Sequence, residues 1–485
     1  MNLDTLAARG ETMHQELGRE YYLTGAGLKG EPAFQAVYDR YADLQSDEAL
    51  AVARASGVPE LLEWVVDVRV GRMVAPLEER QLLWEQSATL DVDGRRIPYL
   101  RAPIELANSP DRAFRIALDD ARSRIGAEGL SALRRERFAT EHEAVAALRM
   151  GDYVEAVGTL AGIDLDALGG EAEAFLRDTA DLYRDALQRL VYRRLGVALT
   201  ELVRADSSWA FRADQYDSAF PPERLVETAT RLMAEMGLDA SQDGRVRFDT
   251  EEREGKQPRA FCVPVRVPDE VYLVLRPRGG HSDYRTFWHE LGHAMHFASA
   301  APELPFAARW LGDNSVTEGF AMLWDHHTLD AAWLARYVEL SRKDARELAF
   351  QLAVSELYLI RRYAAKLTYE LELHRSDLRG LGPSYAQRLT VATGFRYPEA
   401  DHLLDVDPAF YAARYLRAWQ LEAALAAALT ERYDEDWYRN PRAGEAVQGL
   451  MRRGQALPAH RLTAEFADAE LDFARVAARL EARLH

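Results

Sequence analysis

The sequence contains only one cysteine and no long apolar run, and these two features limit the classes of protein to which it can belong. Cys262 has no second cysteine with which to form an intramolecular disulfide bond, which fits a reducing compartment. Residues 1–17 carry charges throughout and lack the apolar stretch of a signal peptide. No segment approaches the roughly 18 consecutive apolar residues of a membrane span. We therefore predict a cytoplasmic protein without a membrane partner.

An excess of positive charge is also lacking. The chain has 60 basic and 78 acidic side chains, a net charge of −18, which disfavours nucleic acid and anionic membranes as partners. At 485 residues it is longer than one hydrophobic core usually serves, so two or three sub-domains or one multi-lobed body are expected. A hydrophobic content of 48% and a charged content of 28% are typical of a soluble globular protein.

Helical periodicity dominates the first part of the chain. Within residues 1–205, apolar residues recur three and four apart with charged residues between them, which predicts an N-terminal helical region. One hairpin is expected within residues 89–100, where an Asp-Gly pair separates two short alternating runs. The pair Gly169-Gly170 predicts a break between helices.

The second part, residues 206–485, is the predicted catalytic region, and it is also mainly helical. Its clear β segment lies within residues 246–276, where two apolar runs predict a hairpin. Pro264 lies in the first run, which favours an edge strand. Long helices are predicted from Ser341 to His374 and from Pro408 to about Tyr433. The fold class is therefore mainly α, with a small β-sheet.

One stretch of the catalytic region carries a metal-binding pattern. Residues 284–300, YRTFWHELGHAMHFASA, contain the motif H-E-x-x-H at His289, Glu290 and His293. At about 100° per residue, residues four apart share one face of a helix, so both imidazoles can bind one metal ion. Glu290 then lies close enough to act on a water molecule at that ion. The alternative is a helix with two surface histidines.

A catalytic zinc ion needs a third protein ligand, and the candidate is Glu318, 25 residues after His293. A structural alternative exists, because Ser315 and Glu318 have the spacing of a capping box at the start of the next helix. A glutamate that coordinates zinc is not free to cap. The residues alone leave both interpretations open.

The stretch HELGHAMH, residues 289–296, resembles the active-site helix of the thimet oligopeptidase and oligoendopeptidase F family of zinc metallopeptidases. In that family the third ligand is a glutamate some 25 residues downstream, where Glu318 falls, and an acidic residue seven positions further on supports the site, where Asp325 falls. The stretch GKQPRAFCV, residues 255–263, is similar to the run that enters the family's β-hairpin, although Arg259 stands where a glycine is usual.

The resemblance implies one zinc ion, held by His289, His293 and Glu318, with Asp325 supporting the site. Zinc lowers the pKa of bound water from about 15.7 toward about 7 and polarises the scissile carbonyl group. Glu290 would take the proton from the water as general base and pass it to the leaving amine.

The same resemblance suggests a source for the second hydrogen-bond donor that the oxyanion requires. The run FYAARY, residues 410–415, resembles an F-Y-x-Y-Q-Y run of oligoendopeptidase F and lies in the predicted substrate region, residues 402–433. Tyr415 is the predicted oxyanion donor, and Tyr411 and His402 are predicted to contact the substrate. Tyr415 and His402 thus join Glu290 as predicted catalytic residues. The alternative is aromatic packing on an amphipathic helix.

The resemblance covers about residues 222–433 and implies two helical lobes around a deep channel that admits short unfolded peptides. The predicted activity is zinc-dependent hydrolysis of internal peptide bonds. A metallocarboxypeptidase of the Taq type is the alternative with the same chemistry. An inactive peptide-binding protein of the same fold is the alternative from another class, and the presence of Glu290 argues against it, because a binding protein needs no general base.

Overall fold

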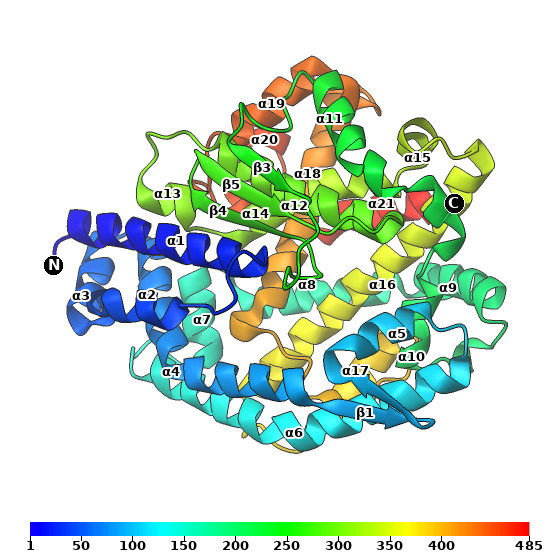
Figure 1. Ribbon diagram of the computed structural model, residues 1–485, viewed down its shortest axis with the longest axis horizontal. Coiled ribbons are helices and arrows are strands. Elements are labelled where there is room, and N and C mark those ends of the chain that lie inside the picture. The colour runs from blue at the N-terminus through cyan, green and yellow to red at the C-terminus, as the bar shows by residue number, and fades with distance from the viewer. Residues whose placement is uncertain (485) are drawn as a thin grey trace. The chain divides into compact units, whose positions relative to one another are not determined.

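The computed structural model describes residues 1–484 and confirms the predicted mainly α fold with a small sheet (Figure 1). Its contacts group the chain into two compact units. Unit 1 contains residues 1–68, 213–349 and 417–476, and unit 2 contains residues 69–212, 350–416 and those from 477 onward. Each unit therefore joins segments that are far apart in the sequence. The division at residue 205 stays a prediction.

Unit 1 combines helices from the start, the middle and the end of the chain with a three-stranded sheet. Its helices are α1 (Leu3–Gly25), α2 (Phe34–Arg40), α3 (Asp47–Ser56), α11 (Leu225–Glu235), α12 (His281–Ser299), α13 (Phe306–Trp310), α14 (Asn314–Asp325), α15 (Ala331–Tyr337), α19 (Pro441–Met451) and α20 (Ala459–Ala467). The pair α12 and α14 is the most closely packed pair of helices in this unit.

The sheet of unit 1 has the order β3 (Val246–Asp249), β5 (Glu270–Val274), β4 (Phe261–Arg266). Strands β4 and β5 are antiparallel, which confirms the hairpin, and β3 pairs with β5 in parallel. Strand β4 lies at the sheet edge, as Pro264 predicted, because proline cannot donate to a ladder. The sheet packs against α1 and α12. Helix α12 is the next element after β5, so the chain turns back on the sheet at this point.

Unit 2 is built from α5 (Ala102–Asn108), α6 (Arg112–Ala146), α7 (Tyr153–Ala161), α8 (Leu165–Asp178), α9 (Ala180–Arg194), α10 (Arg204–Ala210) and α17 (Gly382–Thr393), with the hairpin of β1 (Thr89–Val92) and β2 (Arg95–Pro98). This hairpin confirms the one predicted within residues 89–100. Four long helices have residues in both units: α4 (Pro59–Ser87), α16 (Arg342–His374), α18 (Tyr411–Tyr433) and α21 (Phe473–Leu484).

Two of the predicted helix boundaries are wrong. The pair Gly169-Gly170 does not break a helix, because α8 runs through it. A Cβ atom at Gly169 would lie 2.8 Å from Leu371 Cδ1, so the glycine allows close packing against α16. The helix predicted to begin at Pro408 begins at Tyr411, because Ala409 and Phe410 have φ angles of 46° and 52°, outside the helical region.

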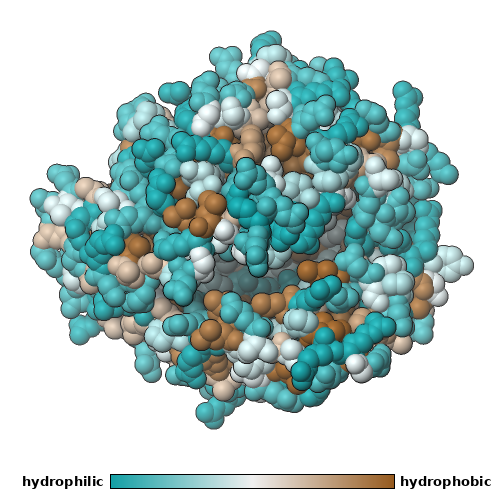
Figure 2. Space-filling model, in the orientation of Figure 1, coloured by the Kyte–Doolittle hydropathy of each residue, from teal (hydrophilic) through white to brown (hydrophobic). Residues whose placement is uncertain are grey.

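The surface drawn in Figure 2 is mainly hydrophilic, in agreement with the charged content of 28%. Hydrophilic residues cover most of the face in Figure 2, and apolar residues on it form small groups. No helix within residues 1–484 is both long and apolar enough to cross a membrane.

Candidate metal centre

Contacts at its N-terminal end and along its buried face fix the position of helix α12. Its first turn follows Gly279, whose φ of 85° needs a glycine. The Asp283 side chain accepts the backbone N–H of Gly279 at 2.9 Å, which ties the chain just before the helix to its first turn. Phe287, Trp288 and Leu291 are fully buried, which fixes the rotation of the helix about its axis. His289 and His293 then share the opposite, partly exposed face.

The start of helix α14 decides between the two interpretations of Glu318. The N-cap is Asp313, whose side chain accepts the N–H of Ser315 at 3.0 Å. Ser315 therefore lies inside the helix, and the capping-box interpretation is wrong. Glu318 lies one turn further on, buried, and is directed at α12.

Helices α12 and α14 approach each other at a glycine. A Cβ atom at Gly292 would lie 2.5 Å from Ala321 Cα and 2.9 Å from Phe320 O, which is closer than atoms can approach. Gly292 lies between the two histidines, and Ala321 lies one turn after Glu318. The missing side chain therefore brings the glutamate within reach of both imidazoles.

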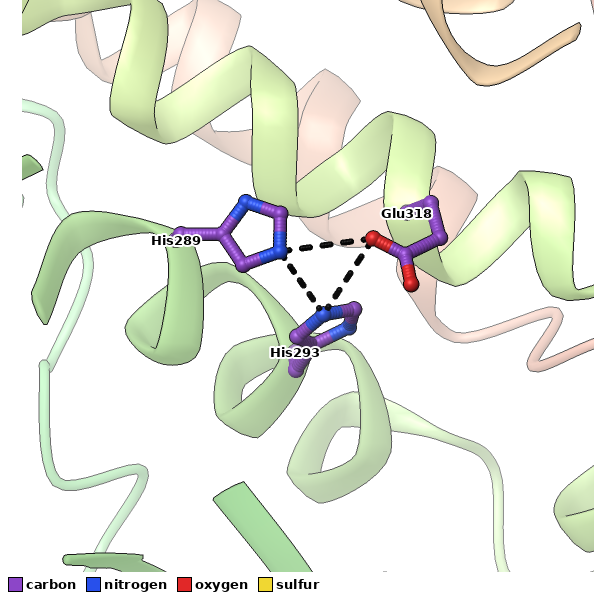
Figure 3. Close-up of side chains that lie close together, drawn as sticks. All are labelled: His289, His293 and Glu318. Atoms are coloured by element: carbon purple, nitrogen blue, oxygen red, sulfur yellow. Dashed lines mark hydrogen bonds and ion pairs between the residues drawn. The ribbon is translucent and has the colours of Figure 1, made fainter. Parts of the chain in front are cut away.

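The three predicted ligands converge (Figure 3). Glu318 Oε2 lies 3.3 Å from His289 Nε2 and 3.7 Å from His293 Nε2, and the two Nε2 atoms are 3.3 Å apart. One ligand atom from each residue lies within 4.8 Å of the others, a group that could hold one metal ion. Glu318 is buried, whereas the side chains of His289 and His293 are 21% and 14% exposed, so the site is reachable from one side.

The Nδ1 atoms of His289 and His293 each have a hydrogen-bonding partner. His289 Nδ1 contacts Asp325 Oδ2 at 2.9 Å, and His293 Nδ1 contacts Thr317 Oγ1 at 2.9 Å. Such contacts fix the ring orientation and leave Nε2 for a metal ion. The sequence indicated Asp325 but not Thr317, and adjacency to Glu318 is the only signal that the sequence offers for it.

The electrostatics of the site favour a bound cation. Burial disfavours charge on His289, but hydrogen bonds to Asp325 and Glu318 outweigh it and raise its pKa to about 10. Burial lowers the pKa of His293 to about 4. The two carboxylates thus stabilise positive charge at His289. Two imidazoles and a carboxylate are also the ligand types that zinc prefers, so these residues fit a metal ion.

Glu290 lies beside the metal ligands and contacts the sheet. Its Oε2 accepts the backbone N–H of Cys262, on edge strand β4, at 2.7 Å. Burial raises the pKa of Glu290 to about 7, partly offset by the charge on His289 and this hydrogen bond. A carboxylate whose pKa lies near neutrality suits a general base. No residue pattern predicted the contact between Glu290 and Cys262.

The remaining predicted site residues, Tyr411, Tyr415 and His402, belong to unit 2. Tyr411 and Tyr415 pack edge to face at 5.2 Å between ring centroids, so they share a face of α18, as their spacing predicted. Tyr415 also packs on Tyr363 of α16. His402 follows the short helix η7 (Glu399–Asp401), and its Nδ1 contacts Glu399 O at 3.1 Å. The catalytic roles of Tyr415 and His402 and the substrate-binding role of Tyr411 stay predictions.

Comparisons with known proteins agree with the fold. No protein-family model matches the chain, and no curated protein matches it. A crystal structure from Chlamydophila abortus, of a protein provisionally described as a peptidase, superposes with a TM-score of 0.67. The match covers 99% of this chain and 89% of that one, at 12% sequence identity. At that identity the likeness shows the fold alone.

Proposed function

We propose that the protein is a zinc-dependent peptidase that hydrolyses internal bonds of short, unstructured peptides. The observation that carries this proposal is the convergence of His289, His293 and Glu318 beside Glu290. The likeness in fold to a structure described as a peptidase supports the same class of reaction.

The residues around the site have distinct roles in this proposal. His289, His293 and Glu318 would hold the ion, which supplies Lewis acidity that polarises a carbonyl group and acidifies water. Glu290, oriented by the Cys262 amide, takes a proton from the attacking water and transfers it to the leaving amine. Asp325 and Thr317 keep both imidazoles in the required orientation.

Strand β4 offers a place for an extended peptide. It is an edge strand, and its Cys262 amide donates to Glu290 rather than to another strand. A peptide that adds to this edge would pass directly beside the general base. A hollow of about 340 Å³ adjoins Val263 and Pro264 of β4 and is lined mainly by apolar side chains, among them Leu17, Phe34 and Trp310. It fits an apolar side chain of the peptide.

The decisive variant is Glu290→Gln, which removes the base but keeps the shape. We expect the purified variant to retain one zinc ion per chain while peptide cleavage falls by about 100- to 10,000-fold. Metal content is measured by mass spectrometry and cleavage on a defined peptide mixture. The matched control is Glu303→Gln, at an exposed position outside the site, which should cleave as the wild type does. Full activity in Glu290→Gln would refute the mechanism.

The mode of cleavage is tested with substrates. A peptide with a blocked C-terminus should be cut at internal bonds, and the products identify the bond. Removal of only C-terminal residues from free peptides would instead support the carboxypeptidase alternative. Peptide binding without any cleavage by the zinc-loaded protein would support the inactive binding protein.

A further inference from the structure

Unit 2 contains a polar cavity that the proposed peptidase reaction does not use. Its volume is about 250 Å³, and its walls come from α5, α6, α10, α16 and the segment around η7. Helices α5, α6 and α10 pack on one another, and η7 packs on α6. Figure 1 shows α5 and α10 side by side. Six charged side chains line the cavity, three of each sign: Asp119, Arg122, Arg204, Arg362, Asp401 and Asp405.

Most of these charges are paired with one another and hold the walls together. Arg204 donates to Asp119 at 2.7 Å and also to Asp401 Oδ2. Arg362 donates to Asp405. These pairs tie α6, α10 and α16 to the segment after η7, so they are structural.

Two side chains of opposite charge at the cavity keep a polar atom without a hydrogen-bond partner in residues 1–484, although one of them, Asp401, also pairs with Arg204. Asp401 is 5% exposed; its Oδ2 accepts from Arg204 and Ser123, while its buried Oδ1 has no hydrogen-bond partner within residues 1–484. The guanidinium of Arg122 lies over the Tyr99 ring at 5.4 Å, and its buried Nε likewise has no partner in the described chain. Both groups act on the Tyr99 hydroxyl: burial raises the pKa of Tyr99, the charge of Arg122 lowers it and that of Asp401 raises it.

The chemistry of these two groups defines a ligand. A guanidinium binds a carboxylate through charge-assisted hydrogen bonds, and a free carboxylate oxygen accepts from an ammonium group. A ligand that satisfies both is a zwitterion. The cavity is smaller than the roughly 300–1,000 Å³ of drug-sized pockets, which favours a single residue over a longer peptide. We propose that the cavity of unit 2 binds a free α-amino acid, with its carboxylate on Arg122 and its ammonium group on Asp401.

Calorimetric titration of the full-length protein tests the proposal. Glycine and L-leucine should bind, whereas N-acetyl-L-leucine and L-leucinamide, which each lack one charge, should bind at least about 10-fold more weakly than leucine. The dipeptide glycylglycine distinguishes amino acids from short peptides, and tighter binding of the dipeptide would contradict the assignment. Absence of amino-acid binding at millimolar concentration would overturn it.

Two variants locate the site. Arg122→Gln should weaken leucine binding by at least about 10-fold. Ser208→Trp, at an exposed residue that lines the cavity, should abolish binding by filling it. The matched control is Arg124→Gln on the same helix, an exposed arginine that pairs with Glu128 and does not line the cavity. Binding that is unchanged in Arg122→Gln would refute the proposal. None of these residues belongs to the metal centre, so the result is independent of peptidase activity.

Discussion

At the scale of single residues, the candidate metal centre depends on side chains that contact its three proposed ligands. Asp325 Oδ2 accepts from His289 Nδ1, and its Oδ1 lies 3.5 Å from Arg285 Nε, so contacts on both oxygens hold the carboxyl group in place. Asp325→Asn keeps the shape but removes the negative charge. We expect zinc affinity to fall by about 10- to 100-fold, because the imidazole becomes a weaker and less well oriented ligand.

Competition with a zinc-binding dye measures this loss. Asp243→Asn is a suitable control, since Asp243 is exposed and its left-handed backbone conformation suits asparagine equally well. Unchanged zinc affinity in Asp325→Asn would contradict the role assigned to this carboxylate.

His296, the last histidine of α12, makes the stability of the fold depend on pH. His296 is 1% exposed and donates from Nε2 to Gly454 O at 3.0 Å, and burial lowers its pKa to about 4. In the unfolded chain His296 is protonated below about pH 6.5, whereas in the folded chain it is protonated only below about pH 4. The free energy of unfolding is therefore highest above pH 6.5 and falls as the pH is lowered toward 4. Between about pH 6.5 and pH 4, protonation of His296 lowers the free energy of unfolding by about 3 kcal/mol.

The variant His296→Gln isolates this contribution. At pH 7 its thermal unfolding midpoint should lie below that of the wild type, because the histidine packs well there. The difference should narrow as the pH falls to 4. A difference that is independent of pH would show that His296 is not held neutral.

The spacing of the H-E-x-x-H motif was sufficient to place His289 and His293 on one helix face, whereas Glu318 was added to them through the family resemblance. The structure brings the three candidate ligands together, but the sequence did not indicate all of their partners. Thr317 and the Cys262 amide contribute through contacts between segments that are distant in sequence. A threonine or a backbone amide carries no chemical signature of such a role.

At the scale of elements, long periodic helices and the hairpin of β4 and β5 were predictable, because burial imposes its period on the sequence. Helix ends were less predictable. Asp313 rather than Ser315 caps α14, since several polar residues stood near its start and each could have served. Gly169 lies inside α8 because a tertiary contact with Leu371 outweighs the low helix propensity of glycine.

Gly292 has a similar role between α12 and α14, and it supports a prediction. In Gly292→Ala the added methyl group would clash with Ala321 and Phe320, so the two helices must separate. We expect a loss of about 1–3 kcal/mol in stability and weaker zinc binding, because Glu318 moves away from the histidines. Gly449→Ala is the control: Gly449 lies in α19 with nothing within 4 Å of its Cβ position. That change should stabilise the protein by about 0.5–1 kcal/mol. Equal thermal midpoints for both variants would contradict this account of the packing.

At the scale of the whole molecule, local sequence patterns say little about which segments assemble. A change of composition near residue 205 suggested a boundary, whereas each compact unit collects segments from three parts of the chain. Periodicity reports the buried face of a helix but not its partner. The sequence therefore predicts individual helices and strands, but not which of the distant segments pack against one another.

The placement of the candidate metal centre within unit 1 predicts an asymmetric response to metal. All three proposed ligands and their partners Asp325 and Thr317 come from α12 and α14 of this unit. Bound zinc stabilises the state that binds it, by about 4 kcal/mol when free zinc is 1,000 times the dissociation constant. Removing the ion with a chelator should therefore speed amide hydrogen exchange in α12, α14 and the strands packed on α12. Exchange in α6 and α8 of unit 2 should stay the same. Hydrogen-exchange mass spectrometry of the chelated and zinc-restored protein measures both regions together, and a uniform change across both units would show that the two unfold as one.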